Sequence, residues 1–155
     1  LCDLLHHLNG NTLCLFQLVE KHGKVLYERM KGKENVYFVY GATSAEQREE
    51  IRTIVDKSKN STTIASYGTF STGINIRNIN NIVLASPSKS KIRVLQSIGR
   101  GLRTSSSKDS ILVFDIADDI SYKGRYNFTL NHFFERLNIY NEEQFNYELS
   151  KVKIK

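Results

Sequence analysis

The chain has 155 residues, of which 40% are hydrophobic and 25% charged, a composition typical of one globular domain and not of a disordered segment. Its formal net charge of +6 comes from 22 Lys and Arg residues against 16 Asp and Glu residues. No apolar run approaches the roughly 18 residues of a membrane span, so we expect no membrane partner.

Short apolar runs predicted as strands alternate along the chain with helical patterns. The predicted strands cover residues 12–17, 36–40, 62–66, 82–85 and 111–116. Helices are predicted over about 20–31, 44–57 and 90–102, and the second has Ser44 and Gln47 at the spacing of a capping box. Residues 118–127 are predicted as a loop before one or two final helices. The pattern predicts an α/β fold, a parallel β-sheet with helices on both faces.

The two cysteines, Cys2 and Cys14, have no metal-binding spacing. We therefore expect reduced packing residues and a cytoplasmic location, which a viral protein in its host cell would share. The opening residues 1–8 are amphipathic and have no signal-peptide pattern, as if they continued a longer protein.

Basic residues are concentrated in the middle of the chain. Between Asp56 and Asp109 there is no acidic residue, whereas there are nine basic ones: Lys57, Lys59, Arg77, Lys89, Lys91, Arg93, Arg100, Arg103 and Lys108. Such a block indicates a face that contacts phosphate. From charge alone, a solvated basic surface without a specific ligand fits equally well.

The predicted helix over 90–102 has two chemically different faces at about 100° per residue. Its polar face consists of Arg93, Gln96, Arg100 and Arg103, and its apolar face of Leu95, Ile98 and Leu102. Gly99 lies beside the polar face and leaves room for a ligand or another domain. The arginines repel one another, and phosphate would neutralise them through bidentate hydrogen bonds. The alternative is an exposed basic helix face.

Three segments resemble motifs of superfamily 2 helicases and occur in the family's order. QSIGRGLR (96–103) resembles motif VI, QxxGRxxR; ASYGTFSTGINI (65–76) resembles motif V; and LCLFQ (13–17) resembles motif IV. SYGTFSTGIN, SKSKIRVLQSIGRGLR and ERLNIYNEEQFNYEL are similar in particular to the phage UvsW-type helicases. The resemblance extends over nearly the whole chain.

The resemblance implies the second, C-terminal RecA-like lobe of a two-lobe motor over residues 1–119, with a helical extension over 120–155. ATP with Mg²⁺ would lie between this lobe and the N-terminal lobe of the same parent chain, and DNA would cross both. Arg100 and Arg103 would be arginine fingers, and Gln96 would orient the same site. Gly73 and Asn75 would lie at the nucleotide ribose, although Asn75 replaces the acid of the more familiar GID form of motif V.

The resemblance also implies contacts to the nucleic-acid backbone, to which the basic block adds two cations. The predicted contact residues are Gln17, Ser66, Thr69, Lys89 and Arg93. The segment from Ser66 to Ile76 is predicted as a hydroxyl-rich loop at the carboxyl end of a parallel strand, where such sheets bind ligands. Ser and Thr hydroxyls suit phosphate oxygens without reading bases, so RNA is an alternative to DNA.

The sequence contains no GxxxxGK[ST] loop and no DExx box. We therefore expect this chain alone not to hydrolyse ATP. The leading interpretation is the second motor lobe of an ATP-dependent DNA helicase or translocase that unwinds or remodels branched DNA. The alternatives are a free-standing nucleic-acid-binding module with a RecA-like fold and no ATP turnover, and a nucleotide-binding regulator that uses the arginine face.

The remaining candidate groups are predicted to be structural. Asp115, Asp118 and Asp119 follow a strand and are predicted as solvated loop acids or helix caps. His22 and His132 are isolated, and no metal site is expected. An aromatic stripe is predicted as core or as a docking face for the other lobe: Phe133, Phe134, Leu137 and Tyr140.

Overall fold

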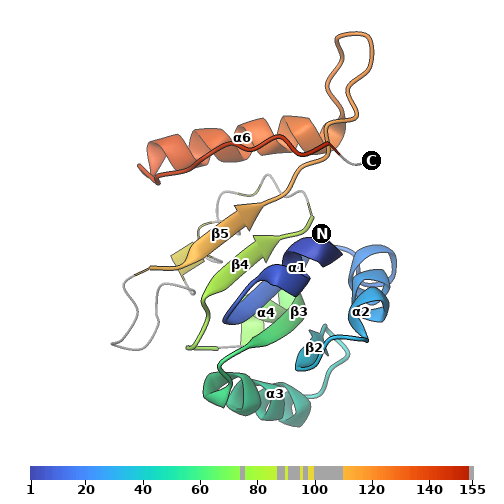
Figure 1. Cartoon of the computed structure of the whole chain (residues 1–155), viewed down its shortest axis with the longest axis vertical. Coiled ribbons are helices and arrows are strands. Elements are labelled where there is room, and N and C mark those ends of the chain that lie inside the picture. Colours follow the sequence, from blue (N-terminus) through green and yellow to red (C-terminus); the bar gives the residue numbers. More distant parts are fainter. Residues whose placement is uncertain (74–75, 87–89, 91–94, 96–97, 100–109, 154–155) are drawn as a thin grey trace.

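A computed structural model describes residues 1–73, 76–86, 90, 95, 98–99 and 110–153 (Figure 1). In chain order its elements are α1 (Cys2–His7), β1 (Asn11–Phe16), the π-helical turn η1 (Val19–Gly23), α2 (Lys24–Met30), β2 (Val36–Val39), α3 (Ala45–Lys57), β3 (Ser61–Ser66), α4 (Tyr67–Gly73), β4 (Asn81–Leu84), β5 (Leu112–Asp115) and α6 (Phe128–Glu142). Every predicted strand is present, and its ends agree to within one residue.

The strands form one parallel sheet in the order β2-β3-β1-β4-β5. β1 lies at its centre, with Phe16 opposite Ser66 of β3 and Leu15 opposite Leu84 of β4. All six residues of β1 are buried, as expected for a strand covered on both faces. The predicted α/β fold class is therefore confirmed, and the carboxyl ends of all strands lie at one edge of the sheet.

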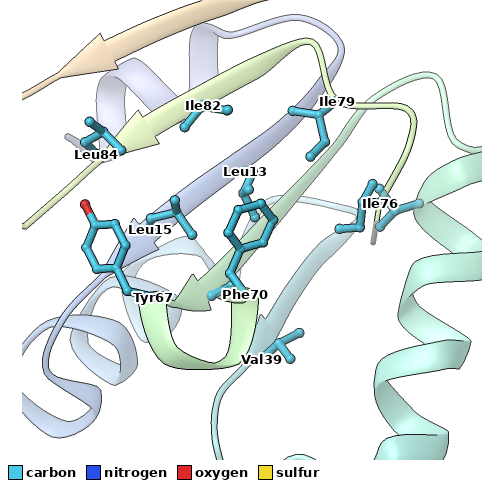
Figure 2. Packing of buried hydrophobic residues seen from close by; sticks show 11 residues of the cluster. Leu13, Leu15, Val39, Tyr67, Phe70, Ile76, Ile79, Ile82 and Leu84 are labelled. Carbon is cyan, nitrogen blue, oxygen red and sulfur yellow. The ribbon is translucent and has the colours of Figure 1, made fainter. Parts of the chain in front are cut away.

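Two hydrophobic clusters cover the two faces of the sheet. On one face α3 and α4 pack against β1, β3 and β4, and Figure 2 shows Tyr67 and Phe70 of α4 directed toward Leu13 and Leu15 of β1. On the other face α1 and α2 contribute Leu5, Leu26 and Met30 to the second cluster. The long helix α6 lies beside β5, at the end of the sheet (Figure 1).

The helix α3 begins at the residue that the sequence indicates. The Ser44 hydroxyl accepts the Gln47 N–H at 3.2 Å, and the Gln47 side chain accepts the Ser44 N–H at 3.2 Å. This reciprocal pair satisfies two N–H groups that a helix start leaves without partners. The predicted capping box is confirmed.

The prediction of a loop after Ser66 is wrong, because residues Tyr67–Gly73 form the helix α4. Its composition is poor in helix-forming residues, with two glycines and two threonines. Tyr67 and Phe70 are nevertheless 4% and 2% exposed, and their burial stabilises a turn that propensity alone disfavours. The predicted helix over 20–31 is also divided into η1 and α2.

The chain after α6 runs back alongside that helix (Figure 1). Gln144 turns it with a φ of 56°, and the Tyr147 hydroxyl donates to Asn141 Oδ1 at 3.0 Å. Lys151 then pairs with Asp119 at 3.2 Å. Within the described part of the chain, no helix has the length and hydropathy needed to cross a membrane.

Candidate nucleotide and nucleic-acid interface

The predicted contact residues Gln17, Ser66 and Thr69 meet at the carboxyl edge of the sheet. Gln17 directly follows β1, Ser66 is the last residue of β3, and Thr69 lies in the first turn of α4. Because β1 and β3 are adjacent and parallel, the register places Ser66 opposite Phe16, the residue directly before Gln17. The structure thus gathers three residues that the sequence separates by up to 52 positions (17 to 69).

The Ser66 and Thr69 hydroxyls are hydrogen-bonded to each other at 2.7 Å, and Ser66 Oγ also accepts the Thr69 N–H at 3.3 Å. Their residues are only 8% and 4% exposed. Ser66 therefore acts as the cap of α4, as Ser commonly does at helix starts. These hydroxyls orient the beginning of α4, whereas Gln17 is exposed to solvent.

A buried serine connects three elements at the same edge. Ser86, which follows β4 and is 1% exposed, accepts the Gln17 N–H at 3.2 Å. Its hydroxyl is also 2.8 Å from His22 Nδ1 in η1, and its carbonyl accepts the Tyr67 hydroxyl at 3.4 Å. His22, which the sequence analysis considered only as a metal ligand, therefore has a structural partner at this edge. The only sequence signal for Ser86 is its place between an apolar strand and Pro87.

The prediction that Asp115 is a solvated loop acid or helix cap is wrong. Its carboxylate accepts Arg136 Nε and Nη2, each at 2.7 Å, and the Tyr140 hydroxyl at 2.8 Å. The side chains of Arg136 and Asp115 are 1% and 9% exposed. This network fastens α6 to the end of β5. Its only signal in the sequence is the i,i+4 spacing of Arg136 and Tyr140, which places both side chains on one face of a helix.

The buried network shifts two pKa values. Burial opposes the charge of Arg136, but the hydrogen bonds and charge of Asp115 outweigh it, so the pKa of the guanidinium is raised. Burial and the neighbouring carboxylate raise the pKa of the Tyr140 hydroxyl well above its usual range. Both groups therefore keep the protonation states that the hydrogen bonds require.

Part of the predicted motif VI helix is visible in the structure. Residues 95, 98 and 99 are helical. Ile98 is 6% exposed and packs against Tyr140, which confirms that the apolar face is turned toward the protein at this residue. A Cβ added at Gly99 would meet no atom within 4 Å, so the space predicted beside the polar face is present.

Four of the predicted nucleotide-site residues lie outside the described part of the chain: Asn75, Gln96, Arg100 and Arg103. So do two of the predicted nucleic-acid contacts, Lys89 and Arg93. Gly73 is the last residue of α4.

The other sequence predictions concern metal and thiol chemistry and the aromatic stripe. In the part of the chain that the structure describes, no cluster of His, Cys, Asp and Glu could hold a metal ion, and Cys2 and Cys14 are free thiols. Burial, followed by the proximity of Cys2, raises the pKa of Cys14 to about 12. Of the aromatic stripe, Tyr140 is buried, whereas Phe134 is 40% exposed.

Comparisons with known proteins match this architecture. Residues 1–105 match the family model described as the helicase conserved C-terminal domain. The chain is 36% identical to the ATP-dependent DNA helicase uvsW of Enterobacteria phage T4, over 93% of this chain and 31% of that protein. It therefore spans about a third of the length of this relative.

Solved structures of helicases also resemble this chain. The crystal structure of T4 UvsW superposes with a TM-score of 0.79 at 36% identity, over 97% of this chain and 33% of that one. The C-terminal domain of the DEAD-box protein Dbp5 superposes with a TM-score of 0.69 at 15% identity, over 92% of this chain and 75% of that one, a likeness of fold.

Proposed function

Because this chain belongs to the helicase conserved C-terminal domain family, we propose that it is the second motor lobe of an ATP-dependent helicase or translocase that remodels branched DNA. The family match and the 36% identity show that the chain is the C-terminal lobe of a helicase similar to UvsW. The branched substrate and the roles of individual residues are our proposal.

The observation that carries the proposal is the orientation of the helical residues Ile98 and Gly99. Ile98 packs against α6, and the space around Gly99 is open. On a helix with Ile98 inward, the sequence spacing predicts that Gln96, Arg100 and Arg103 face outward. Three such donors on one surface suit a polyphosphate that another lobe brings to them.

Arginine at this place would act on the transition state of ATP hydrolysis. Negative charge spreads over the transferred phosphoryl group, and a guanidinium inserted there contributes a rate factor of about 10³–10⁵. We assign this role to Arg103 and Arg100, and an orienting role to Gln96. Gly73 and Asn75 would contact the ribose, while the phosphate loop and the Mg²⁺ ligands would come from an N-terminal lobe.

On the nucleic-acid side, we propose that Gln17 contacts the backbone directly from the end of β1. Ser66 and Thr69 support the same surface by fixing the start of α4. One of their hydroxyls donates to the other, so only the accepting hydroxyl retains a hydrogen for a phosphate oxygen. Lys89 and Arg93 would add phosphate contacts that carry no sequence information.

The test is DNA-stimulated ATP hydrolysis by the full-length protein that contains this chain, in the wild type, Arg103→Ala and Arg77→Ala. Arg77 is an exposed arginine of the same basic block and serves as the matched control. We expect Arg103→Ala to reduce turnover by at least about 10³-fold and to leave DNA affinity within a few-fold, because it contacts ATP and not DNA. Arg77→Ala should retain turnover.

Near-normal turnover in Arg103→Ala would overturn the assignment of the arginine finger. If, in addition, Lys89→Ala and Lys91→Ala abolished DNA affinity while Arg103→Ala behaved as one lost phosphate contact, the chain would be a nucleic-acid-binding module without a role in turnover.

A further inference from the structure

The segment between β5 and α6 forms a small hairpin that projects beyond the sheet and α6 (Figure 1). The N–H and C=O groups of Tyr122 and Arg125 pair with each other at 3.1 and 3.0 Å. The two residues between them, Lys123 and Gly124, have φ values of 49° and 76°. Positive φ at both central positions is the signature of a type I′ turn, which makes a tight, well-defined tip.

The base of the hairpin is closed by the side chain of Asn127. Its amide nitrogen donates to the Asp118 carbonyl at 2.8 Å, and its oxygen accepts the Ile120 N–H at 3.1 Å. Thr129 also donates to the Asp118 carbonyl, at 3.0 Å. Hydrogen bonds at the tip and at the base thus both constrain residues 118–129.

The hairpin exposes several large apolar side chains to solvent. Ile120, Tyr122, Tyr126 and Phe128 are 75%, 72%, 60% and 71% exposed. The Tyr126 ring is supported edge-on by Phe134, with centroids 5.3 Å apart, which fixes its orientation. Exposed apolar groups gathered on one rigid element indicate a contact surface for a partner.

The charge of the hairpin indicates the chemistry of that partner. Residues 120–128 contain two cations, Lys123 and Arg125, and no acidic residue. Lys123 Nζ lies 5.3 Å from the centre of the Tyr122 ring. Asp119, at the base, is already paired with Lys151. An aromatic ring beside two cations is the arrangement that binds an unstacked base together with its phosphate.

We propose that residues 120–128 form a binding site for unpaired nucleotides of single-stranded or forked DNA, with a base stacked on Tyr122 and phosphates contacted by Lys123 and Arg125. The hairpin leaves from the carboxyl end of β5, the sheet edge at which Gln17 and Ser86 also lie. A strand that contacts Gln17 can therefore continue onto the hairpin. The inference rests on the proposed function, because it takes DNA as the substrate.

The test measures binding of the full-length protein to a single-stranded oligonucleotide that carries the fluorescent base 2-aminopurine, and to the blunt duplex of the same sequence. The variants are Tyr122→Phe, which retains the ring, and Tyr122→Leu, which retains apolar area without it. Tyr147→Leu, an exposed tyrosine near the other end of α6, is the matched control. Lys123→Gln tests the phosphate contact.

We expect Tyr122→Leu to weaken single-strand binding by about fivefold or more and to reduce the stacking-dependent change in 2-aminopurine fluorescence, because one base loses its aromatic partner. Tyr122→Phe and Tyr147→Leu should bind as the wild type does, and duplex binding should change little. Lys123→Gln should lower the slope of log K against log[salt] by about one.

Two results would overturn the inference, and only the second would also contradict the proposed function. If the wild type binds single-stranded DNA and Tyr122→Leu binds equally well, the hairpin is not a base-stacking site, and an apolar contact with a protein surface would explain its exposure. If the wild type binds neither DNA, the proposed function fails together with the inference.

Discussion

Arg136→Met should strongly destabilise the fold, because it removes the cation from a buried ion pair. The guanidinium is 1% exposed and the Asp115 side chain 9%, so the carboxylate would remain in the interior with its charge uncompensated. It would also lose two hydrogen bonds of 2.7 Å while retaining the one from Tyr140 at 2.8 Å. Removing one partner of such a pair costs about 3–5 kcal/mol.

The measurement is urea unfolding followed by circular dichroism. With a slope of about 2 kcal/mol per M, a loss of about 4 kcal/mol lowers the midpoint by about 2 M. The double variant Asp115→Asn/Arg136→Met removes both charges and leaves an acceptor for Tyr140, so it should recover at least half of that loss. Lys151→Met, which breaks the exposed pair with Asp119, should leave the midpoint unchanged.

A loss below about 1 kcal/mol in Arg136→Met would refute the reasoning, because the ion pair would then contribute no more than a surface pair. So would a double variant no more stable than Arg136→Met, since the cost would then arise from lost packing and not from a stranded charge.

Three further predictions concern packing, capping and thiol chemistry. Gly23→Ala should destabilise by about 1–3 kcal/mol in the same unfolding assay, because its Cβ would clash with Cζ of the buried Phe16 ring. Ser44→Ala should cost about 1 kcal/mol through loss of the capping box of α3. With a thiol reagent at pH 8, Cys14 should react only on unfolding, because burial raises its pKa to about 12, whereas the partly exposed Cys2 should react in the folded state.

Each of these predictions has its own control and contrary outcome. Gly32→Ala, where an added Cβ meets nothing within 4 Å, should unfold as the wild type does, and equal losses at both glycines would contradict the packing argument. Ser44→Gly should lose only a few tenths of a kcal/mol, so a larger loss than in Ser44→Ala would contradict the capping argument. Rapid labelling of Cys14 without denaturant would show that β1 is less well covered than its burial indicates.

The fold could be predicted from the sequence where local pattern decides the structure. Apolar runs located every strand, and the spacing of Ser44 and Gln47 located the start of α3. The helix α4 could not be predicted, because its glycines and threonines indicate a loop and only the distant packing partners of Tyr67 and Phe70 reverse that preference. The strand order β2-β3-β1-β4-β5 depends on pairings that no local pattern encodes.

The candidate site likewise has parts that local sequence pattern predicts and parts that it does not. The positions of Gln17, Ser66 and Thr69 at the sheet edge follow from the ends of predicted strands, so the sequence sufficed to bring them together. The hydrogen bond between Ser86 and His22 joins residues 64 positions apart, and the ion pair between Asp115 and Arg136 joins residues 21 positions apart. Both contacts depend on tertiary structure, so Asp115 viewed in the sequence alone suggested a solvated acid, and nothing in the sequence indicated that Ser86 lies beside His22.

The central claim is that this chain supplies half of an ATP site, and its most direct test compares the parts with the whole. DNA-stimulated ATP hydrolysis would be measured for the 155-residue chain, for a lobe that carries the phosphate loop and the DExx box, and for the two joined in one protein. We predict hydrolysis at the full rate only in the joined protein, because in the proposed site the phosphate loop and the arginines of residues 96–103 would come from different lobes. Hydrolysis by the 155-residue chain alone, or a full rate in the phosphate-loop lobe alone, would contradict the claim.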